Sequence, residues 1–511
     1  MYFDWLTLHI LSPVENVFGW VIGQQAGSTY LLTRWIVLRG IALIYLIAFI
    51  SLWVQIRGLI GSQGILPVQD FLAAMRTYLG GVSFKMLPTV FWFNASDAAL
   101  TAVCALGVLF SILALLGVMP IGSFVILWVL YLSLTVAGQD FLSFQWDILL
   151  LEAGFLAIFL SPWRFLPGLS GDTIVSPLLL FLVWWLAFRL SFESGIVKLL
   201  SGDHTWRDLT ALDYHYWTQP LPTWTAWYAA QLPMWFHKLS VVLMYILEIG
   251  FPFLMFGPRP LRLASAGGMI LLQIIILATG NYTFFNFLTI ILCFGLIDDR
   301  FWLSVLPQRA VEWIGSPIGM PAPVLWSVCV VVVGLIILFV STVKLLESFS
   351  ERAPVPPFLD AAITMIEPFR SVNAYGLFRV MTTDRQELII EGSDDGKKWM
   401  QYELPWKPGN PKHAPGFVEP HQPRLDWQLW FAAMGTFESE PWVKNVLIRL
   451  LQGSPDVNAL FAENPFPLHP PKYIRVMRYM YRFTTPEEGR VTGEWWHREL
   501  QGEWSPALSL K

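Results

Sequence analysis

The sequence is poor in charged residues and rich in apolar ones. Only 14% of its 511 residues are Asp, Glu, Lys or Arg, whereas 55% are hydrophobic and the mean hydropathy is +0.53. An ordinary soluble protein carries charge on about a quarter of its residues. Water alone therefore cannot be the solvent of this chain, and we expect the lipid bilayer to be its first partner. The net charge of −4 gives no basic field, so nucleic acid is not expected as a partner.

Cysteine and the familiar catalytic motifs are also scarce. The three cysteines, Cys104, Cys293 and Cys329, lie in apolar runs and are interpreted as small buried hydrophobes, because no disulfide framework, zinc spacing or redox pair is available. The sequence contains no Gly-rich phosphate loop, no GxSxG elbow and no HExxH motif. We therefore expect no cofactor and no metal, and the absence of such motifs does not favour an enzyme.

The beginning of the chain lacks the basic region of a cleaved signal peptide. It contains Asp4 and Glu15 before the first long apolar run. A cleaved signal is therefore not expected, and the first true span must itself direct insertion into the membrane.

What the sequence has in abundance is long apolar runs. A helix needs about 20 apolar residues to cross a bilayer. Candidate runs lie at 35–54, 99–118, 121–137, 146–161, 174–198, 239–257, 262–279, 284–297 and 322–345. The runs 146–161 and 284–297 are short, so we predict a polytopic α-helical membrane bundle of about 7–10 membrane segments over residues 1–346.

Two long connections separate some of these runs, at about 55–98 and 199–238. Both are rich in Trp, Tyr, Pro and small polar residues, a composition that suits the lipid headgroup region. The segment 225–238 is predicted to be a helix that lies in the membrane interface rather than crossing it.

The distribution of basic residues gives a weak indication of orientation. If the N-terminus is cytoplasmic, the short cytoplasmic loops hold Arg34, Arg164, Arg259, Arg262, Arg300 and Arg309, and the longer opposite loops hold Arg57, Arg76, Lys85, Arg207 and Lys238. Basic residues concentrated in short loops favour the cytoplasmic side. Nine spans would then place the C-terminal domain outside the cytoplasm, whereas one miscounted span would reverse its position.

The composition changes abruptly after Leu346. Residues 347–357 are predicted to be a Pro-rich linker, and 358–511 a soluble C-terminal α+β domain with a small antiparallel sheet. Strands are predicted within 376–403, with the turn at Asp394–Gly396, and again in KYIRVMRYMYRFT after Pro471. Helices are predicted at about 426–434, 441–452 and 455–462.

Ionisable residues inside the apolar runs are the most informative feature. Each is unfavourable at the bilayer centre unless it is paired or faces a cavity. This intramembrane polar cluster comprises Asp147, Glu152, Arg189, Glu193, Lys198 and Glu248, and Arg39 is a further charge inside an apolar run. Arg189 and Glu193 are four residues apart and are predicted to pair along one helix face. Asp147 and Glu152 lie about 140° apart on a helix, so their helix should be surrounded by protein.

Lys198 lies beyond the reach of that intrahelical pair, and two alternatives stay open for it. It either extends to the aqueous edge of the membrane or has a partner on another helix. The loop that follows contains a second polar cluster, made up of Asp203, His204, Trp206, Arg207, Asp208, Asp213 and His215. Imidazole and carboxylate groups could suggest zinc or iron, but the spacing matches no ligand motif, and we favour hydrogen-bonded loop structure.

Several long strings resemble the lipase maturation factor family of membrane proteins. They are FWFNASDAAL (91–100), FLSFQWDILLLEAGFLAIFLSPW (141–163), SGDHTWRDLTALDYHYWTQPLP (201–222), WFHKLSVVLMYILEIGFPF (235–253), GNYTFFNFLTIILCFGLIDD (280–299), RLDWQLWFAAMG (424–435) and LFAENPFPLHPPKYIRVMRYMYRF (460–483). The resemblance implies a multi-pass protein, of the endoplasmic reticulum membrane in eukaryotes, that acts as a maturation factor or chaperone for secreted lipases. It also implies that the soluble domain binds the client on the non-cytoplasmic side.

The small number of cysteines departs from the family and fits a bacterial homologue in the plasma membrane. The identity of its lipase or other exported client, and its oligomeric state, stay open. If the soluble domain holds a client through aromatic side chains, the available residues are Trp427, Trp430, Phe431 and Trp442, together with Trp495 and Trp496. Most of these could equally belong to the domain core.

A fainter resemblance concerns the string FESGIVKLLSGDHTW (192–206), which is similar to a stretch of the vitamin K-dependent gamma-carboxylase. That resemblance implies an alternative function as an integral membrane enzyme, with Lys198 acting as a base in a bilayer-level pocket. A transporter is a third alternative, because buried charges suit an ion or lipid path, but no inverted repeat is evident.

Overall fold

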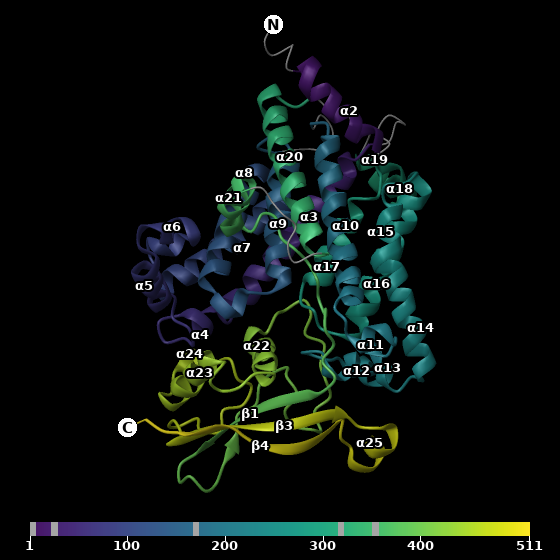
Figure 1. The fold of residues 1–511 in the computed structure, drawn as a ribbon. Helices are drawn as coiled ribbons and strands as arrows, with labels where there is room; N and C mark the ends of the chain where they lie inside the picture. Colours follow the sequence, from purple (N-terminus) through teal and green to yellow (C-terminus); the bar gives the residue numbers. More distant parts are fainter. Residues whose placement is uncertain (1–6, 22–28, 167–172, 315–320, 350–356, 511) are drawn as a thin grey trace.

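The computed structural model describes residues 7–21, 29–166, 173–314, 321–349 and 357–510. Figure 1 shows a tall bundle of helices with the N-terminal helix α2 (Ser12–Val21) at one end and a four-stranded sheet at the other. The short π-helical turn η1 (Thr7–Leu11) precedes α2. The polytopic bundle and the small antiparallel sheet predicted from the sequence are confirmed.

All nine predicted membrane segments form helices within the described residues. Seven helical stretches are long and apolar enough to cross a membrane: α3 (Leu31–Trp53), α7 (Asp97–Leu116), α8 (Pro120–Ala137), α10 (Pro177–Leu200), Met234–Leu254, α16 (Arg259–Thr279) and α20 (Val324–Glu347). The Met234–Leu254 stretch consists of α14 (Met234–Tyr245), the π-helical turn η6 (Ile246–Gly250) and α15 (Phe251–Leu254). The two shorter helices are α9 (Gln145–Leu160) and α17 (Phe285–Phe294).

Local sequence signals explain where several of these helices begin and end. Helix α7 begins after Ser96, whose hydroxyl accepts the Ala99 N–H at 3.2 Å, and it ends at Gly117 in the left-handed conformation. Proline occupies the first turn of α8 and α10, where its missing N–H has no helical partner to lose.

Short helix α17 still connects the two ends of the bundle. At its start, the Asn281 side chain donates to the Gly416 carbonyl of the C-terminal domain at 2.8 Å. Beyond its end, the Asp299 carboxylate accepts the Leu31 N–H at the start of α3 at 2.9 Å. The segment 280–299 therefore runs the length of the bundle, although only ten residues of it are α17.

The connections between the spans are largely helical. Between α3 and α7 lie α4 (Ile56–Ile60), α5 (Val68–Leu79), η3 (Gly80–Val82), α6 (Ser83–Met86) and η4 (Val90–Trp92), and η5 (Gln139–Leu142) precedes α9. Between α10 and α14 lie α11 (His204–Arg207), α12 (Ala211–Thr218) and α13 (Trp224–Ala230), and α18 (Asp299–Val305) and α19 (Gln308–Ile314) follow α17.

One helix prediction and one burial prediction for the membrane part are wrong. The single interfacial helix predicted over 225–238 is divided at Pro233, because α13 ends at Ala230 and α14 begins at Met234 as part of a span. Cys104 and Cys293 are buried as expected, but Cys329 is exposed on α20.

The C-terminal domain contains the strand order β2-β1-β3-β4, with all neighbours antiparallel. The strands are β1 (Arg385–Ser393), β2 (Met400–Gln401), β3 (Tyr473–Phe483) and β4 (Trp496–Leu508). The helices of this region are α21 (Pro357–Ile366), η7 (Glu367–Phe369), α22 (Arg424–Ala433), α23 (Pro441–Leu451), α24 (Pro455–Asn458) and α25 (Pro486–Thr492). Helices α22, α23 and α24 lie between the sheet and the bundle (Figure 1).

Within this domain the predictions are partly confirmed. The β1–β2 turn, strand β3 and helices α22 and α23 lie where they were expected, and α24 is shorter than the predicted 455–462. The stretch 376–383 is not a strand: its Gly376 and Met381 N–H groups bond to the side chains of Gln145 and Asp203 in the membrane part instead of to a neighbouring strand. Strand β4 was not predicted, because as an edge strand it is largely polar. Most of the proposed linker lies outside the described residues.

One hydrophobic cluster runs from the bundle into the C-terminal domain. It includes Tyr45 of α3, Trp184 of α10, Trp427 of α22, Val446 of α23 and Ile390 of β1. The domain is therefore packed directly on the membrane helices, and this contact positions the polar groups described next.

Candidate functional site

A buried ion pair joins α9 to α10 in the middle of the bundle. The Arg189 guanidinium is paired with the Glu152 carboxylate, and both side chains are fully buried. Arg189 also donates to the Asn373 carbonyl at 2.8 Å. The predicted intrahelical pair of Arg189 with Glu193 is therefore wrong, because the carboxylate of the neighbouring helix takes the guanidinium.

The chain returns from α20 to this ion pair through residues 371–381, which we call the strap. The Glu152 carboxylate accepts the Asn373 N–H at 2.8 Å and the Tyr375 hydroxyl at 2.8 Å. The Glu193 carboxylate accepts the Tyr375 N–H at 2.7 Å. Non-helical backbone at membrane depth is tolerated only where protein supplies its partners. The two carboxylates thus hold the strap against α9 and α10.

A second buried pair joins the bundle to the C-terminal domain. The Arg424 guanidinium, at the start of α22, donates to both oxygens of Asp147 at 2.9 and 2.7 Å. The Tyr131 hydroxyl of α8 donates to the same carboxylate at 2.6 Å. Asp147, Glu152 and most of α9 are buried, which confirms that this helix is surrounded by protein.

Lys198 has its partner on the next span. Its ammonium group lies 2.6 Å from the Glu248 carboxylate on η6, and both side chains are buried. The Trp206 ring lies 5.5 Å from the ammonium nitrogen. The alternative in which Lys198 extends to water is therefore wrong. The enzyme hypothesis, which needed Lys198 beside Glu152, Asp147 or Arg189, has no support, because those groups are paired elsewhere.

The loop cluster binds the far end of the strap. The Asp203 carboxylate accepts the Thr205 N–H at 2.8 Å as a helix cap and the Met381 N–H at 2.6 Å. The indole N–H of Trp206 donates to the Phe378 carbonyl at 3.0 Å. For these two residues the hydrogen-bonded role favoured from the sequence is confirmed, but their partners in the strap were not predicted.

The remaining members of the loop cluster are separated from one another. The ring of His215 packs on Phe378 at 4.8 Å, and burial together with the Lys198 charge lowers the pKa of His215 to about 4. Asp213 lies 2.5 Å from the His237 ring nitrogen, whereas His204, Arg207 and Asp208 are exposed. Within the described ranges no three His, Cys, Asp or Glu side chains are grouped as metal ligands would be.

Most of the aromatic residues predicted to contact a client are buried. Trp427 packs on Trp146 at 4.7 Å, Trp442 packs on Phe141 at 5.6 Å, and both contacts join the domain to the bundle. Trp430 is also buried and donates to the Thr218 carbonyl at 2.9 Å, and Trp496 lies in the sheet core. Phe431 is 38% exposed, and Trp495 is half-buried. The buried tryptophans are not available to a client in this structure.

Two polar contacts at the same junction were also missed. The Arg385 guanidinium of β1 is fully buried and donates to the carbonyls of Gln219 and Pro220 in the loop before α13. The Glu419 carboxylate accepts the Tyr282 N–H in the turn before α17, and burial raises the pKa of Glu419 to about 8. From the sequence alone, Arg385 and Glu419 would be taken for ordinary surface charges, because no neighbouring residue indicates that their partners lie in distant segments.

Comparison with known proteins agrees with this two-part architecture. The family model described as "Lipase maturation factor transmembrane domain" matches residues 32–304, and the "Lipase maturation factor C-terminal domain" matches residues 371–506. The second match begins where the strap begins.

Curated relatives match over nearly the whole chain. Lipase maturation factor 2 of Gallus gallus is 36% identical, over 93% of this chain and 81% of the relative. The Homo sapiens protein of the same name is 36% identical, over 95% of this chain and 84% of the relative. Lipase maturation factor 1 of Bos taurus is 33% identical, over 94% of this chain and 90% of the relative. No solved structure matches the chain. On the strength of both family matches and these relatives, the chain belongs to the lipase maturation factor family.

Proposed function

We propose that this protein is a membrane-embedded maturation factor that assists the folding or assembly of secreted lipases or other exported clients. The observation that carries the proposal is the similarity to lipase maturation factors 1 and 2 across both the membrane part and the C-terminal domain. A match to the membrane part alone, or to the C-terminal domain alone, would have suggested only that this chain shares an anchor or a soluble domain with those proteins.

The contacts between the two parts support a chaperone that is fixed on the membrane. The Asp147–Arg424 pair, the Trp146–Trp427 contact and the strap hold the C-terminal domain against the bundle. These contacts keep the C-terminal domain at a fixed distance from the bilayer. An exported chain emerges from the membrane unfolded, so a domain held there can meet it.

The arrangement of the spans supports a non-cytoplasmic C-terminal domain. Figure 1 shows α2 and the sheet at opposite ends of the bundle, which is the arrangement expected for an odd number of passes, such as the nine predicted from the sequence. The short loops at the α2 end contain Arg164, Arg259 and Arg300, and this bias favours the cytoplasmic side for that end. We infer a location in the plasma membrane of a bacterium, or in the endoplasmic reticulum membrane if the source is eukaryotic.

The test is the specific activity of secreted lipases in a host that lacks the gene. We expect secreted lipase protein with reduced activity per molecule, restored by the full chain and not by a chain ending at residue 349. Unchanged lipases, with no other exported protein affected, would contradict the proposal. Recovery of activity by the shortened chain would show instead that the membrane part acts alone.

A further inference from the structure

The outer edge of β4 is an unpaired strand edge. Strand β4 is the last strand of the sheet and is thirteen residues long. Its first residue, Trp496, bonds outward to the Pro411 carbonyl at 3.3 Å. From Arg498 to Ser505 no backbone group on the outer side has a backbone partner within the described part of the chain. A row of free N–H and C=O groups is a template for a further strand.

The ladder register identifies which groups face outward. The Thr484 N–H donates to the Trp495 carbonyl at 3.1 Å, which sets the register of a hydrogen-bonded pair, although at this end of the ladder the Trp495 N–H donates to the Pro411 carbonyl at 2.9 Å instead of to Thr484. Bonded and non-bonded pairs alternate along an antiparallel ladder. The pairing continues regularly from Trp496 to Leu500, so the N–H and C=O groups of Arg498 and Leu500 face outward. The outward bond of Trp496 agrees with this alternation. Beyond Leu500, bulges interrupt the ladder and limit the usable edge to about five residues.

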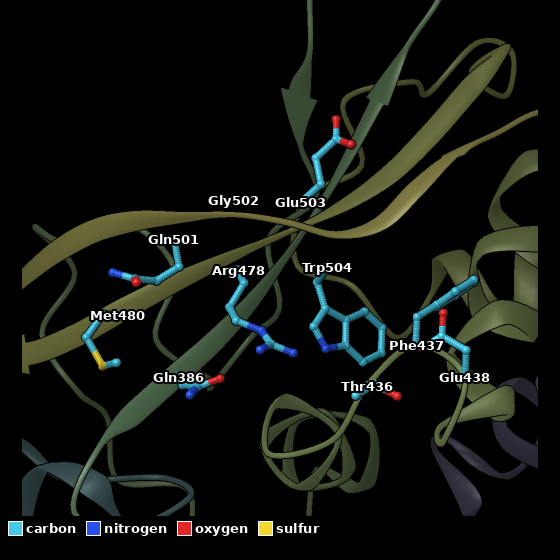
Figure 2. A pocket seen from close by; sticks show the side chains of 10 residues that line it. All are labelled: Gln386, Thr436, Phe437, Glu438, Arg478, Met480, Gln501, Gly502, Glu503 and Trp504. Atoms are coloured by element: carbon cyan, nitrogen blue, oxygen red, sulfur yellow. The ribbon is translucent and has the colours of Figure 1, made fainter.

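A cavity lies directly beside this edge, on the face of the sheet toward α22. It has a volume of about 450 Å³ and is lined by Gln386, Phe437, Glu438, Arg478, Gly502 and Trp504, among others. Figure 2 shows the Arg478 and Trp504 side chains lying below β4 and pointing toward the segment that carries Thr436 and Phe437. The absence of a side chain at Gly502 leaves the space open at the strand itself. The cavity therefore offers a polar recess for a side chain of a neighbouring strand.

We propose that the outer edge of β4 binds an extended segment of a client polypeptide, which adds as a fifth strand. The outward N–H and C=O groups of Arg498 and Leu500 can pair with the backbone of another extended chain. The adjacent recess would then select among the side chains of that added chain. The recess is lined by the Glu438 carboxylate, the Arg478 guanidinium and the Gln386 amide, whereas the Glu503 carboxylate points to the other face of the sheet and pairs with Arg475. This polar lining favours polar over apolar client residues. The edge lies at the end of the molecule farthest from α2, where an unfolded exported chain can reach it (Figure 1). This inference rests on the proposed function, because it names the part of a client that is bound.

The experiment uses the full-length protein in detergent and peptides of about ten residues that tile a secreted lipase dependent on it. Leu500 is 57% exposed and sits opposite Tyr479 in a non-bonded pair. Leu500→Pro therefore removes an outward N–H without breaking the β3–β4 ladder. We expect about tenfold weaker peptide binding from this change, equivalent to the loss of one or two hydrogen bonds. Leu500→Ala keeps the N–H and is expected to bind as the wild type does.

A second measurement protects the test against misfolding of Leu500→Pro. The best-binding peptide is N-methylated at alternate residues and offered to the unaltered protein. We expect one methylation register to abolish binding and the other to preserve it. Equal binding of both registers, or of Leu500→Pro and wild type, would overturn the proposal. A β4-to-β4 dimer that Leu500→Pro dissociates, with no peptide bound, would also overturn it. If neither a lipase nor any other exported protein depends on this protein, it is instead the proposed function that fails.

Discussion

The buried carboxylates of this protein bind backbone and guanidinium groups that come from distant parts of the chain. Glu152 accepts bonds from Arg189 and from the strap residues Asn373 and Tyr375. Asp147 does the same for Arg424 of the C-terminal domain. An ionised carboxylate removed from water needs such partners. The charges that suggested a catalytic pocket are therefore bound by distant parts of the chain, while Arg189 Nε, Arg424 Nε and one oxygen of Glu193 have no hydrogen-bond partner among the described residues.

The Asp147–Arg424 pair gives a prediction at this scale. Asp147→Asn leaves the buried Arg424 guanidinium without its counter-ion, and we expect a loss of about 3 to 5 kcal/mol in the free energy of unfolding. The measurement is denaturant unfolding in detergent. As a control, Asp140→Asn changes an exposed acid on the neighbouring turn η5 and should be nearly neutral. Adding Arg424→Met to Asp147→Asn should recover part of the loss, and an additive double variant would contradict the pairing.

Glu419 gives a prediction about pH. Burial raises its pKa from 4.5 to about 8 in the folded protein, so the folded state binds more protons than the unfolded state between these values. Stability should therefore fall as the pH rises through this window, by at most about 1.4 kcal/mol per pH unit. We expect Tm to be lower at pH 8 than at pH 6. Glu419→Gln, which keeps an oxygen for the Tyr282 N–H, should be less sensitive. An equal pH dependence in both proteins would contradict this assignment.

At the scale of elements, the sequence predicted the helices and strands that follow from a local pattern of apolar residues. The spans follow from continuous apolar runs, and β3 follows from alternating apolar residues between Pro471 and Pro486. It could not predict pairings across long separations. Glu152 and Asn373 are 221 residues apart, and nothing near Arg189 distinguishes Glu193 as a poorer partner than Glu152. The strap was mistaken for a strand for the same reason, since its partners are side chains of distant helices.

The strap can be loosened by a single substitution. The Asn373 side chain donates to Glu152 at 3.1 Å, to the Ile148 carbonyl at 3.2 Å and to the Arg370 carbonyl at 2.9 Å. Asn373→Ala removes these three contacts, which the two N–H donors of one amide group share, so the loss is about 2 kcal/mol. We expect faster amide hydrogen exchange across 371–381. Ser371→Ala is the matched control, because that hydroxyl makes only one long bond, at 3.4 Å. Unchanged exchange in Asn373→Ala would show that the backbone contacts alone hold the strap.

At the scale of the whole molecule, the orientation in the membrane can be tested with cysteine labelling. Leu468 is 94% exposed in the C-terminal domain, and Ser304 is exposed at the opposite end. In a Cys329→Ala background, Leu468→Cys should react with an impermeant maleimide added outside intact cells. Ser304→Cys should react only after the membrane is opened. The reverse pattern would place the C-terminal domain in the cytoplasm and remove its access to exported clients.

The continuous core also predicts how the C-terminal domain behaves alone. Separated from the bundle, residues 358–511 would expose Trp427 and Trp442, whose ring partners Trp146 and Phe141 belong to the membrane part. Arg424 would lose Asp147, and Arg385 would lose its carbonyl partners. Newly exposed apolar surface and an unsatisfied polar interior both oppose stable folding.

We therefore expect the isolated segment 358–511 to bind a hydrophobic dye strongly and to lack a cooperative thermal transition. The comparison is the same segment released by protease from the full chain in detergent, which should stay attached to the bundle through these contacts. A cooperative transition in the isolated segment, with the Tm of the full protein, would contradict the prediction. It would show that the sheet and α22 to α25 suffice for folding, and that the bundle contributes position rather than stability.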